Sequence, residues 1–329
     1  MSSTGESPLK EALGGGWVLS PDAGRWLNAL IMTGFAVIWN GFVWAVFFHR
    51  PGDLADGLFQ LIPLLLFGLI GLVVAALAGY LLLKAAYTPR PMLVLSNPRL
   101  IAGGSTTLTW NILGNVSRLA NLHIVLVGYE ESEYTKGTNT STDQRDITTI
   151  PLWSGSQPAV TGSAQILIPA TALPTWRGKK NRLRWKITVK GAVSALPDVN
   201  DTFPVEVVPA APQAGQIVIA GPALGESNLG ITLDAVPTVA GDAYAARVRW
   251  QLPTTPRTLG LLLTWEATGK GDTETGIGLK QTFPGEAADA LAAAFVLPSL
   301  PPRHKGALVS ILWTLELVAD DKVVHRRKL

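Results

Sequence analysis

Two long stretches near the N-terminus contain no charged side chain. They cover residues 26–48 and 57–83, and neither has the polar stripe of an amphipathic helix. At about 1.5 Å per residue, a helix over the first stretch spans roughly 35 Å, enough to cross a bilayer with some tilt. The pattern predicts transmembrane helices at about 26–48 and 57–84, joined by a tight polar turn at 49–56. A secretory signal peptide is disfavoured, because the first stretch is too long and starts too late.

Beyond residue 92 the chain changes to short apolar runs separated by turn residues. This spacing is typical of antiparallel β-sandwiches. At 182–187, Leu183, Trp185 and Ile187 alternate with three cations, which predicts a strand with one solvated face. The expected strands are 106–113, 122–129, 183–190 and 203–208, then 230–233, 246–252, 259–267, 277–283, 293–297 and 307–317.

Two parts of this β-rich region are similar to each other. The matching residues are Pro169, Gly178 and Trp185 in one copy and Pro298, Gly306 and Trp313 in the other. Their offsets are 129 residues for the prolines and 128 for the glycines and the tryptophans. The repeat predicts two copies of one unit: a strand, a proline corner, a glycine turn and a return strand whose tryptophan fills the core.

These patterns divide the chain into five parts. Residues 1–25 are expected to be an N-terminal tail and 26–87 the helical hairpin, with a stiff proline-containing connector after it. Residues 92–208 and 216–329 are the two expected sandwiches, and 209–215 is a Pro- and Ala-rich linker. The predicted fold class is mainly β with a transmembrane α-helical hairpin.

The repeated unit resembles the end of an arrestin-like domain, and its repetition resembles the tandem pair of arrestin sandwiches. This implies two tandem arrestin- or immunoglobulin-like β-sandwiches. The residues at 28–30, 34–35, 38–41, 128–131, 134 and 136–140 are similar to those of uncharacterised bacterial two-span membrane proteins with such a β region, a domain of unknown function. The resemblance implies the bacterial inner membrane and supplies no functional residues to transfer.

The basic residues that flank the helices predict their orientation. Lys10, Arg25, Lys84 and Arg90 lie on the side of the termini, and Arg50 alone lies in the turn. Since cytoplasmic flanks are enriched in Lys and Arg, the β-domains are expected in the cytoplasm.

Composition narrows the classes of function. The 329 residues include no Cys, which excludes disulfides and thiol catalysis. The formal charge of +3 is spread thinly, which argues against a nucleic-acid partner. The mean hydropathy of +0.28 fits a chain with membrane-spanning segments.

No catalytic constellation stands out. The histidines His49, His123, His304 and His325 include no pair at metal-binding helical spacing, and no Gly-x-Ser-x-Gly motif occurs. The glycine-rich segment 268–276 fits a hairpin better than a phosphate or calcium loop. We expect no enzyme activity, cofactor or metal; a hydrolase would require His123 or His304 near a carboxylate and a hydroxyl.

Three features are candidates for interaction. A basic cluster is either a solvated strand face or a contact for anionic lipid headgroups; it comprises Arg177, Lys179, Lys180, Arg182, Arg184 and Lys186. The acidic segment 130–146 is expected to be an exposed loop that binds a partner. Polar and small residues that could contact another helix in the membrane are Asn28, Asn40, Gly41, Gly68, Gly71 and Gly79.

These features favour a non-enzymatic integral membrane interaction protein, an accessory or scaffolding subunit of a larger bacterial membrane complex. Its expected partners are the lipid bilayer and other membrane protein subunits. The alternative is a membrane-anchored sensory module for envelope polymers or glycans, with Trp153 and Trp176 as stacking platforms. The sequence does not identify a small-molecule ligand.

Overall fold

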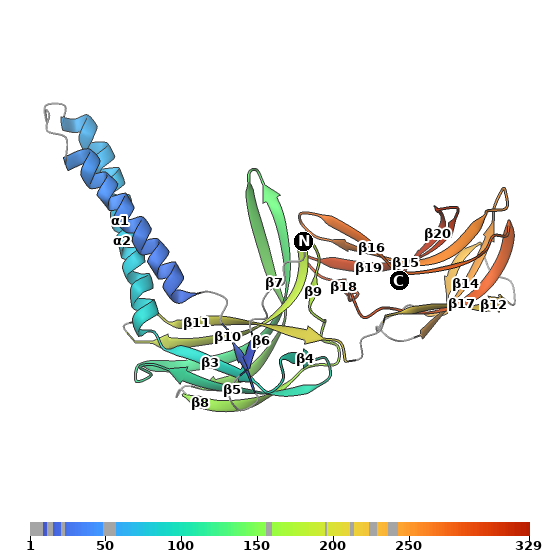
Figure 1. Ribbon diagram of the computed structural model, residues 1–329, viewed down its shortest axis with the longest axis horizontal. Coiled ribbons are helices and arrows are strands. Elements are labelled where there is room, and N and C mark those ends of the chain that lie inside the picture. The colour runs from blue at the N-terminus through green and yellow to red at the C-terminus, as the bar shows by residue number, and fades with distance from the viewer. Residues whose placement is uncertain are drawn as a thin grey trace.

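The chain is mainly β, with two apolar helices near its N-terminus (Figure 1). The computed structural model describes residues 9–11, 16–20, 24–48, 57–155, 160–194, 196–210, 214–223, 229–235 and 243–329. The expected polar turn at 49–56, with Arg50, lies outside the described residues, as does the middle of the expected linker, 211–213.

The two helices pair and extend from one end of the β region (Figure 1). They are α1 (Arg25–Phe48) and α2 (Gly57–Tyr87). The first helix begins one residue earlier than predicted, and the second ends three residues later. The segments Arg25–Val46 and Ile62–Tyr87 are long and apolar enough to cross a membrane. Only residues 88 and 89 separate α2 from the first following strand, so the connector is as short as its prolines suggested.

Two sheets, built from strands on both sides of the helices in the sequence, face each other as the first sandwich. One contains, in order, β1 (Leu9–Glu11), β2 (Trp17–Leu19), β3 (Arg90–Leu95), β5 (Ser105–Leu113) and β8 (Thr161–Leu167). The other contains β4 (Arg99–Ile101), β11 (Val199–Val208), β10 (Asn181–Val193), β6 (Leu119–Lys136) and β7 (Asn139–Gly155), with β9 (Trp176–Arg177) paired to β10. One core joins both sheets, including Trp110 from β5 and Trp185 from β10.

Two further sheets form the second sandwich. One contains β12 (Gln216–Pro222), β17 (Ala288–Val296), β14 (Ala243–Gln251) and β13 (Gly230–Leu233). The other contains β16 (Thr273–Pro284), β15 (Thr258–Thr268), β19 (Ser310–Ala319) and β18 (His304–Lys305), with β20 (Lys322–Lys328) also paired to β19. Phe295 of β17 and Trp313 of β19 lie in their shared core.

Hydrogen bonds confirm the repeat. The Trp185 indole donates to the Leu173 carbonyl at 2.8 Å, and the Trp313 indole donates to the Pro301 carbonyl at 3.1 Å. Each glycine turn closes in the same way, with the Gly178 amide on the Asn181 carbonyl and the Gly306 amide on the Val309 carbonyl, both at 2.9 Å. All four pairs of equivalent positions are offset by 128 residues.

The N-terminal segment differs from the expected tail. Residues 17–19 pair antiparallel with β3, residues 9–11 pair with 17–19, and Leu19 is buried in the first core. Three consecutive apolar residues, Trp17, Val18 and Leu19, allow this short segment to extend a sheet. The polar composition of residues 1–25 as a whole had suggested a tail. Residues 1–8, 12–15 and 21–23 lie outside the described part of the chain.

The expected acidic loop at 130–146 is wrong. These residues belong to the long hairpin of β6 and β7, which pair continuously at its end up to Lys136 and Asn139. A two-residue turn closes it, with Gly137 at φ +65°, a conformation that glycine adopts readily at the first position of a hairpin turn. Threonine and tyrosine, which favour strands, outweigh the carboxylates that suggested a loop. The hairpin rises on the same side of the β region as the helices (Figure 1).

Candidate functional site

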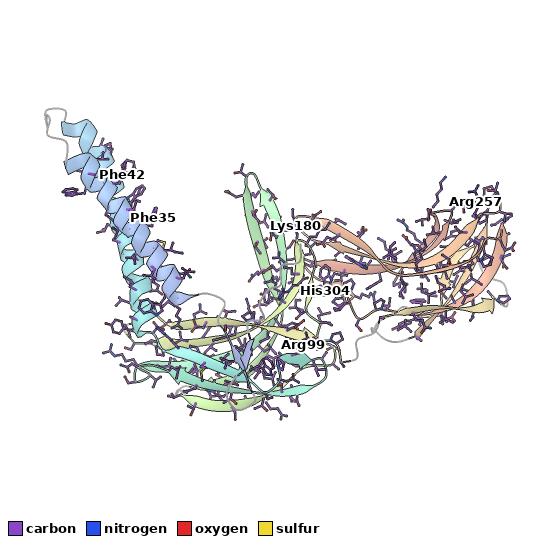
Figure 2. The ribbon with its side chains drawn as sticks, viewed as in Figure 1. Phe35, Phe42, Arg99, Lys180, Arg257 and His304 are labelled. Atoms are coloured by element: carbon purple, nitrogen blue, oxygen red, sulfur yellow. The ribbon has the colours of Figure 1, made fainter. Side chains whose placement is uncertain are left out.

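A carboxylate from the first sandwich enters a turn of the second. Glu130 of β6 has a side chain only 3% exposed. Its Oε1 accepts the Ala307 amide and its Oε2 accepts the Val309 amide, both at 2.9 Å, while His304 Nε2 lies 3.4 Å from Oε2. Lys180 and His304 mark the place where the two sandwiches meet (Figure 2).

A second carboxylate makes the reciprocal contact. Glu274 of β16, also buried, accepts the Lys179 amide at 2.7 Å and the Lys180 amide at 3.1 Å. These amides occupy the repeat positions of Ala307 and Leu308, so each sandwich inserts a glutamate into the same turn of the other copy. A Cβ on Gly178 would lie 2.6 Å from a Glu274 oxygen, and one on Gly306 would lie 2.1 Å from a Glu130 oxygen. The glycine turns of the repeat therefore provide space for the partner carboxylate.

A third contact uses the glycine-rich segment at 268–276. It forms the predicted hairpin, between β15 and β16. Its Lys270 amide donates to Ser132 Oγ at 3.0 Å, and Asn181 Nδ2 donates to the Asp272 carbonyl at 3.2 Å. Ser132 and Asn181 are fully buried, so the hairpin is a docking element of the second sandwich.

A small apolar cluster accompanies these polar contacts. Leu183 of the first sandwich is buried with Ala267, Val309 and Ile311 of the second. The rings of Trp176 and Trp265 meet edge to face beside them, with centroids 6.0 Å apart. We call the three polar contacts and this cluster the junction.

The electrostatics of Glu130 favour its charged form. Burial raises the pKa of the carboxyl, but hydrogen bonds from the backbone of Val309, Leu308 and Ala307 and from His304 outweigh it. The net pKa of Glu130 is lower than its ordinary value. A buried charge held by backbone donors is specific to one geometry, which favours a fixed arrangement of the two sandwiches.

The rim of the junction carries an exposed ion pair between Lys270 and Asp143 of the β6–β7 hairpin. The hydrogen bond with Lys270 lowers the pKa of Asp143, and the same bond raises the pKa of Lys270. Because both side chains are exposed, this pair adds less to the junction than the buried glutamates do.

The basic cluster lies beside the junction. Arg182 pairs with Glu131 at 2.8 Å and Glu133 at 3.4 Å, and Arg184 Nε lies 3.6 Å from Glu131. Lys186 stands over the Tyr129 ring, 4.3 Å from its centroid. Lys179 and Lys180 lie in the turn that binds Glu274, and Arg177 is in β9. The predicted solvated face is therefore partly covered by the acidic end of β6.

The helix pair joins two of the predicted intramembrane residues. Asn40 Nδ2 donates to the Ala36 carbonyl at 2.8 Å and to the Gly71 carbonyl of the other helix at 3.3 Å. A Cβ on Gly71 would lie 2.4 Å from Asn40 Oδ1. In contrast, a Cβ at Gly41, Gly68 or Gly79 would meet open space within the chain. Asn28 lies near the base of the helices and lines a cavity there.

The base of the helices is fixed to the first sandwich. Arg25, which opens α1, pairs with Asp201 of β11 through Nε at 3.2 Å and through Nη2. Its guanidinium also donates to the carbonyls of Thr88 and Pro89. The side chains of Arg25 and Asp201 are only 13% and 10% exposed, so this is a largely buried ion pair.

The catalytic candidates remain apart. His123 Nδ1 lies 2.9 Å from Ser154 Oγ, whereas His304 meets Glu130. Within the described residues, neither histidine has both a carboxylate and a hydroxyl partner, and no three His, Asp or Glu side chains are grouped to hold a metal ion. His49 lies outside these residues, and His325 is in β20.

The two tryptophans proposed as stacking platforms pack against other tryptophans. The rings of Trp153 and Trp110 have centroids 5.5 Å apart, and Trp176 contacts Trp265 in the junction. Neither arrangement resembles a pair of open aromatic platforms.

Sequence reasoning placed Glu130 in the acidic segment and Glu274 in the glycine-rich segment but missed their role in the junction, and it did not single out Ser132, Asn181 or Asp201. The repeat marked the two turns, but nothing in the sequence shows which distant carboxylate enters each turn. No model of a known protein family matches this chain, and no curated protein matches its sequence.

Proposed function

We propose that the chain is a non-enzymatic integral membrane interaction protein, an accessory or scaffolding subunit of a larger bacterial membrane complex. The observation that carries this proposal is the apolar surface of α1 and α2. Ile38 is 72% exposed and Leu65 is 70% exposed, and the helices pack chiefly against each other. Burial of this surface requires lipid, other membrane helices or both.

The β region is suited to present a surface at a fixed position. The junction holds two sandwiches together, and Arg25 ties the first to the base of α1. In this proposal the sandwiches are arrestin-like, lie in the cytoplasm and contact the soluble parts of the complex. The long β6–β7 hairpin supplies the most extended surface for such a contact (Figure 1).

The first test is to extract the tagged full chain from its native membrane in a mild detergent and determine the mass and composition of the particle. We expect a stoichiometric second membrane protein. A particle that contains this chain alone contradicts the accessory role. A reporter fused after Leu329 tests orientation, since activity only outside the cytoplasm contradicts the proposed topology.

A photo-crosslinking pair tests the helix surface itself. Phe42 is exposed on α1, where its side chain projects away from the pair, and Ala36 is buried (Figure 2). A crosslinker at Phe42 should capture the partner, whereas one at Ala36 should not. Equal capture at both positions contradicts a specific helix interface.

A further inference from the structure

A cavity of about 320 Å³ lies where the helices meet the first sandwich. Its wall combines the ends of both helices with β6, β7, β10 and β11. This volume falls in the range of small-ligand sites. The cavity is separate from the junction, because none of the junction glutamates lines it.

The charge of the cavity favours an anion. Three cations line it, Arg25, Lys84 and Lys186, against one carboxylate, Asp201. The carboxylate is paired with Arg25, so that pair is neutral as a whole. Among the described residues, neither Lys84 nor Lys186 has a carboxylate within ion-pair distance, and Lys186 stands over the Tyr129 ring. Two ammonium groups therefore remain for an anionic ligand.

The surroundings favour an anion attached to an apolar tail. Leu81 lines the cavity, and the surface of α2 continues from it through exposed Leu77 toward the middle of the helix. Asn28 and Asn200 add polar side chains at the cavity wall. In a membrane, a cavity at the ends of two spanning helices lies at the level of the lipid headgroups.

We propose that this cavity binds the phosphate headgroup of an anionic phospholipid, with its acyl chains along α1 and α2. The proposal rests on the membrane anchoring proposed above. It differs from the lipid contact expected from the sequence, which used the whole basic cluster. Only Lys186 of that cluster lines the cavity.

The test compares two variants that remove the same charge. The delipidated full chain in detergent is titrated with phosphatidylglycerol or phosphatidylcholine, and binding is followed by native mass spectrometry. We expect the unaltered protein to prefer phosphatidylglycerol and the K84Q/K186Q variant to bind it about 30-fold more weakly, because each lost cation weakens binding about fivefold. The matched variant K280Q/K322Q removes two exposed cations of the second sandwich that do not line the cavity, and it should bind as the unaltered protein does.

Three results would overturn the proposal: equal binding of the two lipids, equal loss in the two variants, or displacement of phosphatidylglycerol by millimolar inorganic phosphate. The last result would assign the cavity to a free anion. Flotation with pure phosphatidylcholine vesicles tests membrane anchoring independently of the headgroup site. A protein that floats but shows no preference contradicts the headgroup site alone, whereas a protein that fails to float contradicts membrane anchoring.

Discussion

The first sandwich is attached at two places, and each attachment buries a charge in a different way. At the helix base, Arg25 meets the opposite charge of Asp201 and two backbone carbonyls. At the junction, Glu130 meets mainly neutral backbone amides. Loss of Arg25 leaves a buried carboxylate without its counter-charge, whereas loss of the Glu130 charge leaves only neutral donors. The helix attachment should therefore be the more sensitive of the two.

The largest effect is expected from Arg25→Met, which leaves Asp201 buried and unpaired. We expect a loss of about 3 kcal/mol in the free energy of unfolding of the first sandwich, measured by calorimetry of the full chain in detergent. Arg99→Met is the control, because Arg99 and Glu206 form an exposed pair at 3.5 Å, and it should cost less than about 0.5 kcal/mol. The double variant R25M/D201L should recover much of the loss; a double variant as unstable as the single one would refute the charge argument.

Glu130→Gln should have the next largest effect. The amide keeps the size of the carboxyl group but turns an NH₂ group toward one backbone donor, at a cost of about 2 kcal/mol. Its calorimetric signature is an earlier, separate transition of the second sandwich. Glu206→Gln is the matched control at an exposed site. A single unchanged transition in E130Q would show that the carboxylate does not hold the junction.

Lowering the pH should test whether the charge of Glu130 stabilises the protein. The folded pKa of Glu130 lies below the reference value of 4.5, so its stabilisation is complete above pH 4.5 and is lost as the pH falls through the folded pKa. The difference in melting temperature between the unaltered protein and E130Q should shrink below pH 4.5. A difference that stays constant down to pH 3 would mean that the carboxyl group is not the cause.

The smallest effect is expected in the helix pair. Asn40→Leu removes one bond to the Gly71 carbonyl, worth about 0.6 kcal/mol between helices in a membrane. Circular dichroism during titration with a denaturing detergent measures this loss. Gly79→Ala adds a methyl group in open space and should leave the curve unchanged. A larger loss in G79A than in N40L would place the helix contact elsewhere.

Features that depend on neighbouring residues in the sequence could be predicted, whereas contacts between residues far apart in the chain could not. Strand β13 was predicted to the residue, and the repeat located both buried tryptophans, because alternation and turn residues are local signals. Strands β3, β4 and β7 were not singled out, since their pattern is short or polar. The partners of Glu130 lie more than 170 residues away, and no local pattern specifies such a contact.

The central claim is that the reciprocal glutamates hold the two sandwiches as one unit, and an inter-domain distance tests it most directly. The chain has no native Cys, so spin labels can be placed cleanly at Q165C on the first sandwich and A245C on the second, both exposed positions. Double electron–electron resonance should give one narrow distance distribution that broadens in the E130Q/E274Q background. A broad distribution in the unaltered background, or no change on removal of both carboxylates, would contradict the claim.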